Sequence, residues 1–220
     1  MNFNKKFKLW AACGERKEAQ YIYFSDGFAY ATDNWLLVRL PLSVFALFSD
    51  EERDALEGFR LHGTLMKVLQ TFDDATVSSG TEADNDGNVT RVVVISAKAG
   101  DNEVRFILRD TGFKSPDFES VLADDEQNAK PVTAVNIGVE SLKTIASAMG
   151  QESLLMRFSR AGNKTFIKPT DDTYAGMVGV VITTCEEATI PGFGPDDESR
   201  QELPEGGMLL LPEGEEQNEE

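Results

Sequence analysis

The sequence predicts an α+β fold in which short helices alternate with antiparallel three-stranded meanders. Two observations predict it. Short apolar segments with period-two alternation recur along the chain, bounded by Gly, Asp or Asn turn residues. Two other segments place their apolar residues at helical spacing instead. The chain has 220 residues, of which 41% are hydrophobic and 27% charged, so it is long enough for one or two domains with a real core.

The first meander is expected at residues 20–42, "QYIYFSDGFAYATDNWLLVRLPL". Gly27 can take the positive φ that a tight hairpin turn needs, and Asp33-Asn34 form a second turn pair. The apolar residues that fit period two are Tyr21, Tyr23, Phe28, Tyr30, Leu36 and Val38. A further strand is expected before the meander, at residues 7–13 (FKLWAAC).

A second unit follows the acidic segment 43–58, which is expected to be a linker or a short helix. Residues 61–72 predict a helix, with Thr64 as its cap. The apolar residues at helical spacing are Leu61, Leu65, Val68 and Leu69. Three strands are expected next, at residues 74–79, 90–98 and 103–110.

A third unit is expected to start with a strand at residues 131–138 and a helix at 139–150, which Gly150 ends. Its remaining strands are expected at residues 153–159, 164–170 and 176–184. The chain therefore predicts repeated α-βββ half-units. Residues 1–120 would hold the first two, and residues 121–185 the closing one.

The C-terminal residues 186–220 predict a largely disordered acidic tail. They hold 12 acidic residues and one basic residue, Arg200, so their formal net charge is −11. The whole chain carries −17, which leaves −6 for residues 1–185. An apolar island at residues 207–212, "GMLLLP", is the exception and predicts a docking strand. A mildly acidic body argues against a general polyanion binder, but it allows one basic face.

Candidate catalytic and metal-binding residues are few. His62 is the only histidine and has no nearby nucleophile in the sequence, so a structural role is expected. "DNDG" at residues 84–87 resembles the start of a calcium loop, but Val93 stands where the bidentate acid belongs. Cys13 and Cys185 lack metal-ligand spacing and predict a reducing compartment. We therefore expect a non-catalytic protein without metal or cofactor, and an unrelated α+β enzyme is the weakest alternative.

Membrane association is not expected either. No apolar run reaches the length of a membrane-spanning helix, and the N-terminal "MNFNKKFKLWAACGERKE" has only a few apolar residues before charge returns. These features, together with the two unpaired cysteines, predict a cytoplasmic protein.

Four segments resemble the bacterial sliding clamp, the β subunit that serves as processivity factor of DNA polymerase III. They are "YIYFSDGFAYATDNWLLVRLPL" (21–42), "LHGTLMKVLQTF" (61–72), "FKSPDFESVL" (113–122) and the segment 136–184. They occur in the family's order. The chain departs from the family in its first unit, where "ERKEAQ" replaces a helix, and at 180–185, where "VVITTC" replaces the family's terminal motif. The resemblance is to a reduced, phage-like or mobile-element-like relative, and it implies a DNA-clamp-like α+β fold with helices packed on antiparallel sheets.

The resemblance implies a DNA replication accessory protein that holds double-stranded DNA without reading its sequence and tethers a polymerase or another replication protein. Arg60 and Lys67 on the first helix and Lys143 on the second are the expected phosphate contacts. So few contacts per chain would require a homo-oligomer. The alternative is a clamp-fold protein-binding module with no grip on DNA, which the acidic tail and the scarcity of helix lysines favour.

Overall fold

The fold is α+β, with antiparallel sheets and a few short helices, as the sequence predicts. The computed structural model describes residues 3–45, 49–83, 88–110, 112, 115–123, 137–158, 164–171, 174 and 176–183. The chain divides into residues 1–185 and 186–220. The expected tail with its apolar island, the DNDG segment at 84–87 and the expected strand up to residue 136 lie outside the described residues.

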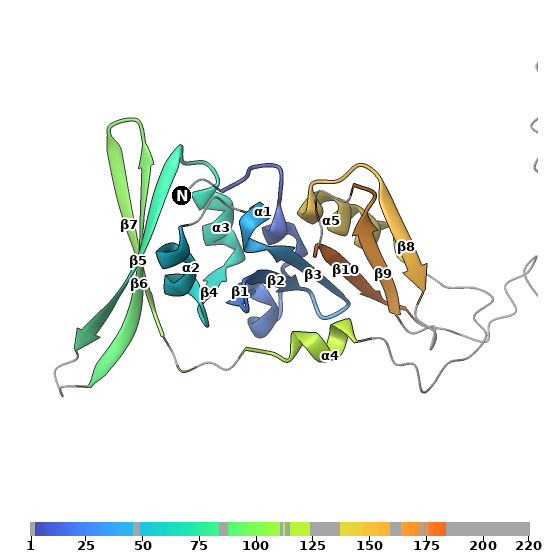
Figure 1. Ribbon diagram of the computed structural model, residues 1–220, viewed down its shortest axis with the longest axis horizontal. Helices are drawn as coiled ribbons and strands as arrows, with labels where there is room; N and C mark the ends of the chain where they lie inside the picture. The colour runs from blue at the N-terminus through green and yellow to red at the C-terminus, as the bar shows by residue number, and fades with distance from the viewer. Residues whose placement is uncertain are drawn as a thin grey trace, which may run out of the picture. The chain divides into compact units, whose positions relative to one another are not determined.

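A seven-stranded antiparallel sheet contains both the first and the last meander (Figure 1). Its strands are β1 (Tyr21–Ser25), β2 (Phe28–Thr32), β3 (Leu36–Pro41), β4 (Arg60–His62), β8 (Leu154–Phe158), β9 (Lys164–Pro169) and β10 (Val178–Ile182), in the order β4-β1-β2-β3-β10-β9-β8. The two meanders join where Leu37 of β3 pairs with Val180 of β10. The parts expected at 1–120 and 121–185 therefore share this sheet, and the boundary between them stays a prediction.

A separate three-stranded sheet is formed by β5 (Asp74–Ala83), β6 (Val89–Ala99) and β7 (Asn102–Arg109). All three strands are confirmed at the expected places. The structure extends β5 by four residues, because its pairing with β6 continues as far as Ala83 opposite Val89. The turn between β6 and β7 has Gly100 at φ 57°, a left-handed conformation that glycine adopts without steric cost.

The helices are short. They are the 3-10 helices η1 (Leu9–Ala12) and η2 (Lys17–Gln20) and the α-helices α1 (Leu42–Phe45), α2 (Asp50–Leu56), α3 (Gly63–Leu69), α4 (Phe118–Leu122) and α5 (Val139–Met149). The expected strand at 7–13 is wrong, because Leu9 and Ala12 are both fully buried and their spacing of three suits one helical turn. The helix expected at 61–72 begins at Gly63, and His62 caps it in place of Thr64 by accepting a hydrogen bond from the Thr64 amide at its Nδ1.

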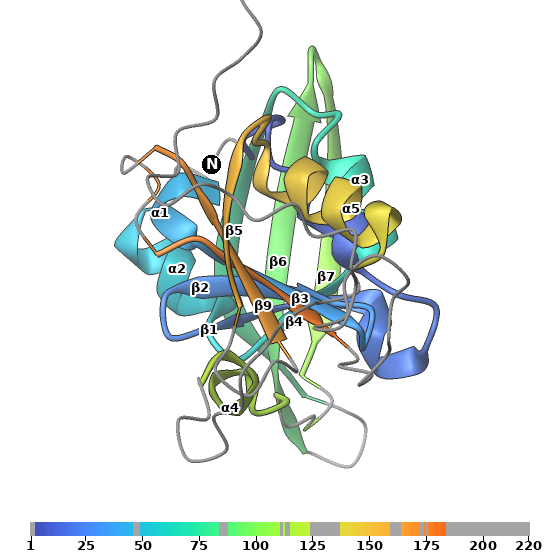
Figure 2. The ribbon, with the colours of Figure 1, turned by 90° about the vertical axis from the view of Figure 1, so that its right-hand side faces the viewer.

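Both faces of the seven-stranded sheet carry buried apolar residues. One face packs against η1 and α5 in the main core, which includes Leu9, Ala31, Val38, Ile145 and Val181. The opposite face packs against α4, which lies on the other side of the sheet from α5 (Figure 2). Since η1 also packs against α3, the helices α3 and α5 lie on the same side of the sheet, with η1 as their shared neighbour.

Candidate partner-binding pocket beneath α4

The α4 face of the seven-stranded sheet is an aromatic and aliphatic surface. Its buried members are Tyr23, Tyr30, Leu37, Phe166, Val178 and Val180, together with Phe118 of α4. The Phe118 ring stacks on the Tyr30 ring with centroids 4.6 Å apart and an interplanar angle of 8°, and it is tilted against Tyr23 at 5.3 Å. Phe118 is only 6% exposed, so it is the residue that anchors α4 to the sheet.

Polar side chains hold both ends of α4. Glu119 Oε1 accepts hydrogen bonds from Tyr30 Oη at 3.1 Å and from Arg39 Nη1 at 3.4 Å. Lys164 Nζ donates to the Ser120 and Ala123 carbonyls at 3.3 Å and 3.0 Å. Burial raises the pKa of Tyr30 to about 12, and the neighbouring Glu119 carboxylate adds to the rise, so the phenol stays protonated and keeps donating near neutral pH.

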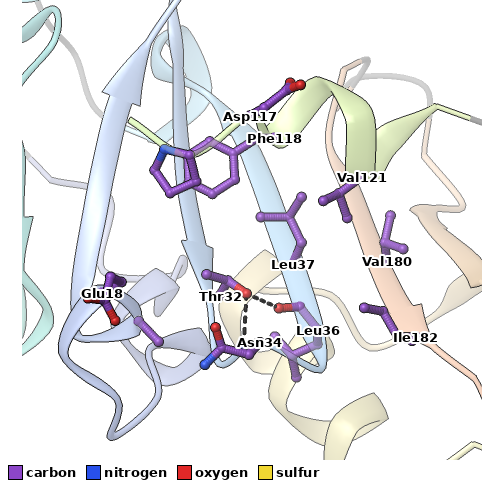
Figure 3. A pocket seen from close by; sticks show the side chains of 12 residues that line it. Glu18, Thr32, Asn34, Leu36, Leu37, Asp117, Phe118, Val121, Val180 and Ile182 are labelled. Carbon is purple, nitrogen blue, oxygen red and sulfur yellow. Dashed lines mark hydrogen bonds between the residues drawn. The ribbon is translucent and has the colours of Figure 1, made fainter. Parts of the chain in front are cut away.

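A pocket of about 200 Å³ lies between α4 and strands β2, β3 and β10. It is lined by Glu18, Ala19, Thr32, Asn34, Leu36, Leu37, Pro116, Asp117, Phe118, Val121, Val180 and Ile182 (Figure 3). Thr32 Oγ1 donates to the Leu36 carbonyl at 2.6 Å and accepts from the Asn34 amide at 3.0 Å, so this hydroxyl is already engaged. The volume is below the roughly 300–1,000 Å³ of typical small-molecule sites. The pocket suits one or two apolar side chains better than a cofactor.

Exposed apolar residues lie in the pocket lining and beside it. Trp35 at the turn before β3 is 61% exposed and Ile182 at the end of β10 is 42% exposed. The two are adjacent, because the Ile182 amide donates to the Trp35 carbonyl at 2.8 Å. Large exposed apolar side chains that gather beside a pocket are characteristic of interaction surfaces. One signal for this site is visible in the sequence, since Phe118 and Val121 lie in the clamp-like segment 113–122, but no residue there was expected to bind a partner.

The three expected DNA contacts do not gather in one place. Lys67 on α3 and Lys143 on α5 are exposed on the side of the sheet that η1 covers. Lys67 Nζ lies 4.7 Å above the Trp10 ring, and Lys143 Nζ pairs with Glu140 at 2.7 Å. Arg60 was expected on the first helix, and this is wrong. It lies on β4, with its guanidinium 4.3 Å from the ring of Tyr21, which packs at the edge of the α4 face.

Three further lysines lie just before η1, which packs against both α3 and α5, and sequence reasoning missed them. Lys5, Lys6 and Lys8 are exposed in the segment that leads into η1. The Lys8 amide donates to the Ser147 carbonyl in the last turn of α5, which places this segment at the C-terminal end of that helix. We call these five residues, Lys5, Lys6, Lys8, Lys67 and Lys143, the lysine face. The run "NKKFK" was the available signal, but it stands before η1, where a strand was expected.

His62 and Cys13 are near each other at the start of α3 and line an open pocket with Trp10 and Lys67. Burial raises the pKa of the Cys13 thiol to about 12, which keeps it protonated and unreactive near neutral pH. His62 serves as the helix cap. In the described part of the chain, no group of three or more His, Cys, Asp or Glu side chains is arranged to hold a metal ion.

The fold and these surfaces define an α+β protein with antiparallel sheets that carries an apolar pocket on one side of a sheet and a lysine face on the other. Comparison of this chain with protein-family models, with curated proteins and with solved structures finds no match. Among the described helices, none is both long enough and apolar enough to cross a membrane.

Proposed function

We propose that this chain is a non-catalytic tethering protein of the sliding-clamp type, which captures an apolar segment of a replication protein in the pocket beneath α4. The observation that carries the proposal is the pocket itself, with Ile182 exposed in its lining and Trp35 exposed beside Ile182. The order α3-β5-β6-β7 supports it, because a helix followed by three antiparallel strands is the α-βββ half-unit that the resemblance to clamps implies.

The pocket favours a short segment with large apolar side chains. Its walls come from Leu36, Leu37, Val121 and Val180, and the carboxylates of Glu18 and Asp117 are among the groups around it. Burying one large apolar side chain contributes about 1.5–3 kcal/mol. The acidic groups disfavour a segment with carboxylates next to its apolar anchor, since like charges would meet there. We therefore expect an apolar, neutral or basic segment.

Peptide selection on the full-length chain tests this proposal. Peptides from a random library displayed on phage should converge on a motif with at least one aromatic or long aliphatic anchor. Replacing Ile182 by Asp should weaken binding of the selected peptides by at least about tenfold, because it places a carboxylate among apolar side chains. A tenfold weaker affinity corresponds to a loss of about 1.4 kcal/mol in binding free energy. Fluorescence anisotropy with labelled synthetic peptides measures the dissociation constants.

Val104→Asp is the matched control for Ile182→Asp. Val104 is a β-branched strand residue with 41% exposure, close to the 42% of Ile182, but it lies on β7 in the three-stranded sheet. This variant should bind the selected peptides as the wild type does. Equal affinity of all three proteins, or failure to select any convergent motif, would contradict the proposed pocket.

A second candidate function, retention of double-stranded DNA, is favoured by the lysine face. Lys5, Lys6 and Lys8 are exposed on the segment that reaches the C-terminal end of α5, and cations at a helix C-terminus are electrostatically compatible with its partial negative charge. Residues 1–185 carry a net charge of −6, so such a grip would be weak for each chain. Several copies would have to act together, and we therefore propose that DNA-holding requires a homo-oligomer.

Salt dependence tests the DNA-holding function. The logarithm of the binding constant for a short fluorescein-labelled duplex should fall linearly with the logarithm of salt concentration, with a slope near −0.9 for each phosphate contacted. Replacing Lys8 and Lys67 by Ala should make this slope shallower by about two for each chain engaged. Lys98→Ala with Lys168→Ala is the control, because both lysines are exposed but lie on β6 and β9. Equal slopes for all three proteins would show that the lysine face does not contact DNA phosphates.

A further inference from the structure

Helix α4 is attached to the sheet more weakly than the strands beneath it are attached to each other. It has five residues, and isolated helices of this length are unstable. Its place depends on Phe118 with the partly buried Val121 and Leu122, on the carboxylate of Glu119, and on Lys164, whose ammonium reaches the Ser120 and Ala123 carbonyls. All of these contacts involve side chains. Local opening that breaks a few such contacts costs much less than global unfolding.

The sheet beneath α4 does not depend on α4 for its integrity. Strands β2, β3 and β10 are joined by backbone hydrogen bonds, and their other face packs against η1 and α5. Lifting α4 would expose Tyr30 and Val178 together with the pocket wall at Val180, which would become one continuous apolar surface. Such a surface could accept more of a partner segment than the pocket of about 200 Å³ does when α4 is in place.

We infer that α4 is a displaceable strap, and that Phe118 occupies in the free protein an aromatic site on Tyr30 that an aromatic side chain of the partner takes when α4 lifts. This inference rests on the proposed pocket function and adds a regulatory step to it. Phe118 acts as an internal competitor, because its near-parallel stacking on Tyr30 is the contact that an incoming aromatic side chain would make.

A displaceable α4 and a fixed pocket wall predict opposite effects of removing Phe118 on peptide affinity. A ligand that binds one state of a two-state protein has an apparent dissociation constant equal to the intrinsic constant divided by the fraction of that state. If the open form is a minor species, removing Phe118 should increase its population. Phe118→Ala should therefore bind the selected aromatic peptides at least about tenfold more tightly than the wild type does. If Phe118 only forms a wall of the pocket, the same variant should bind them more weakly.

Hydrogen exchange on the full-length chain tests the opening without any ligand. The Ala123 amide donates to the Glu119 carbonyl at 2.9 Å and reports on α4, while the amides of β10 that pair with β3 report on the sheet. In the wild type, the α4 amide should exchange at least about 100-fold faster than these β10 amides, because it opens locally. Phe118→Ala should accelerate α4 exchange further and leave the protected amides of β10 unchanged.

Phe106→Ala is the control for loss of an aromatic ring. Phe106 is half-buried on β7 and contacts Phe72 edge-on at 6.4 Å, away from α4, so this variant should change neither peptide affinity nor α4 exchange. The strap is overturned if the Ala123 amide exchanges no faster than β10, or if Phe118→Ala weakens peptide binding while Ile182→Asp does so too. In that second case the pocket function stands without the strap. If no peptide binds either the wild type or Phe118→Ala, the pocket function and the strap are both overturned.

Discussion

Replacing Gly179 by Val should lower the free energy of unfolding by about 3 kcal/mol, at the upper end of the range for overpacked cores. Gly179 lies in β10, where α5 approaches the strand closely. A Cβ atom there would stand 2.7 Å from Ile145 Cγ2 and 3.3 Å from Ile145 Cδ1. Valine adds two further methyl groups in the same place, so α5 has to move away from the sheet. Urea unfolding followed by circular dichroism measures the loss.

Gly80→Val is the matched control for this experiment. Gly80 also lies in a strand, but a Cβ there would meet only Val92 Cγ2, at the ordinary contact distance of 3.6 Å. Valine favours strands more than glycine does, so Gly80→Val should be neutral or stabilising. In a double-mutant cycle, Gly179→Ala should cost less in the Ile145→Ala background than in the wild type, since Ile145→Ala removes the Cγ2 atom, and the double variant should therefore lose less than the sum of the two single losses. Equal losses for Gly80→Val and Gly179→Val would show that close packing of α5 is not the cause.

The sequence predicted those elements whose signals are local. The hairpin between β1 and β2 is confirmed, with Asp26 at φ 53° and Gly27 at φ 77°, as a turn with two left-handed residues requires. The end of α5 is confirmed in the same way, because Gly150 takes φ 57° and its amide bonds back to the last turn. In each case a few adjacent residues specify the conformation.

The pairing of β3 with β10, which joins the two meanders, could not be predicted, because these strands carry buried residues on both faces. β10 has apolar residues on both sides, so alternation does not tell which face meets α5 or which strand pairs with β3. The pocket was missed for a similar reason. Glu119 meets the Tyr30 hydroxyl, which is 89 positions away in the chain, and no local pattern indicates this contact.

The wrong strand at residues 7–13 shows how a long-range polar contact overrides local propensity. Gln70, just after α3, is 8% exposed. Its Nε2 donates to the Phe7 carbonyl at 2.8 Å, and its Oε1 accepts from Trp10 Nε1 at 2.9 Å. These two bonds hold the chain on both sides of Leu9, the first residue of η1. Neither contact can be seen in the "FKLWAAC" segment itself.

Replacing Gln70 by Leu should therefore lower the free energy of unfolding by about 2–4 kcal/mol, because two polar groups lose their partner and each buried unsatisfied group costs about 1–3 kcal/mol. Leucine has a similar size, which limits the effect of packing. Gln20→Leu is the control, since Gln20 makes a local hydrogen bond to the Glu15 carbonyl on the surface, and it should cost less than about 0.5 kcal/mol. Thermal unfolding measures both variants. Similar losses would mean that the Gln70 network does not hold η1.

Gln70→Leu also separates the two candidate surfaces, because it removes no lysine and touches no residue of the pocket. Freeing Trp10 releases the ring beneath Lys67 and the segment that carries Lys5, Lys6 and Lys8. If the lysine face holds DNA, this variant should bind the duplex several-fold more weakly at low salt, since the lysines lose their common placement. Its affinity for the selected peptides should not change, because α4 lies on the opposite side of the sheet. Weaker peptide binding with unchanged DNA binding would contradict the assignment of the two functions to these two faces.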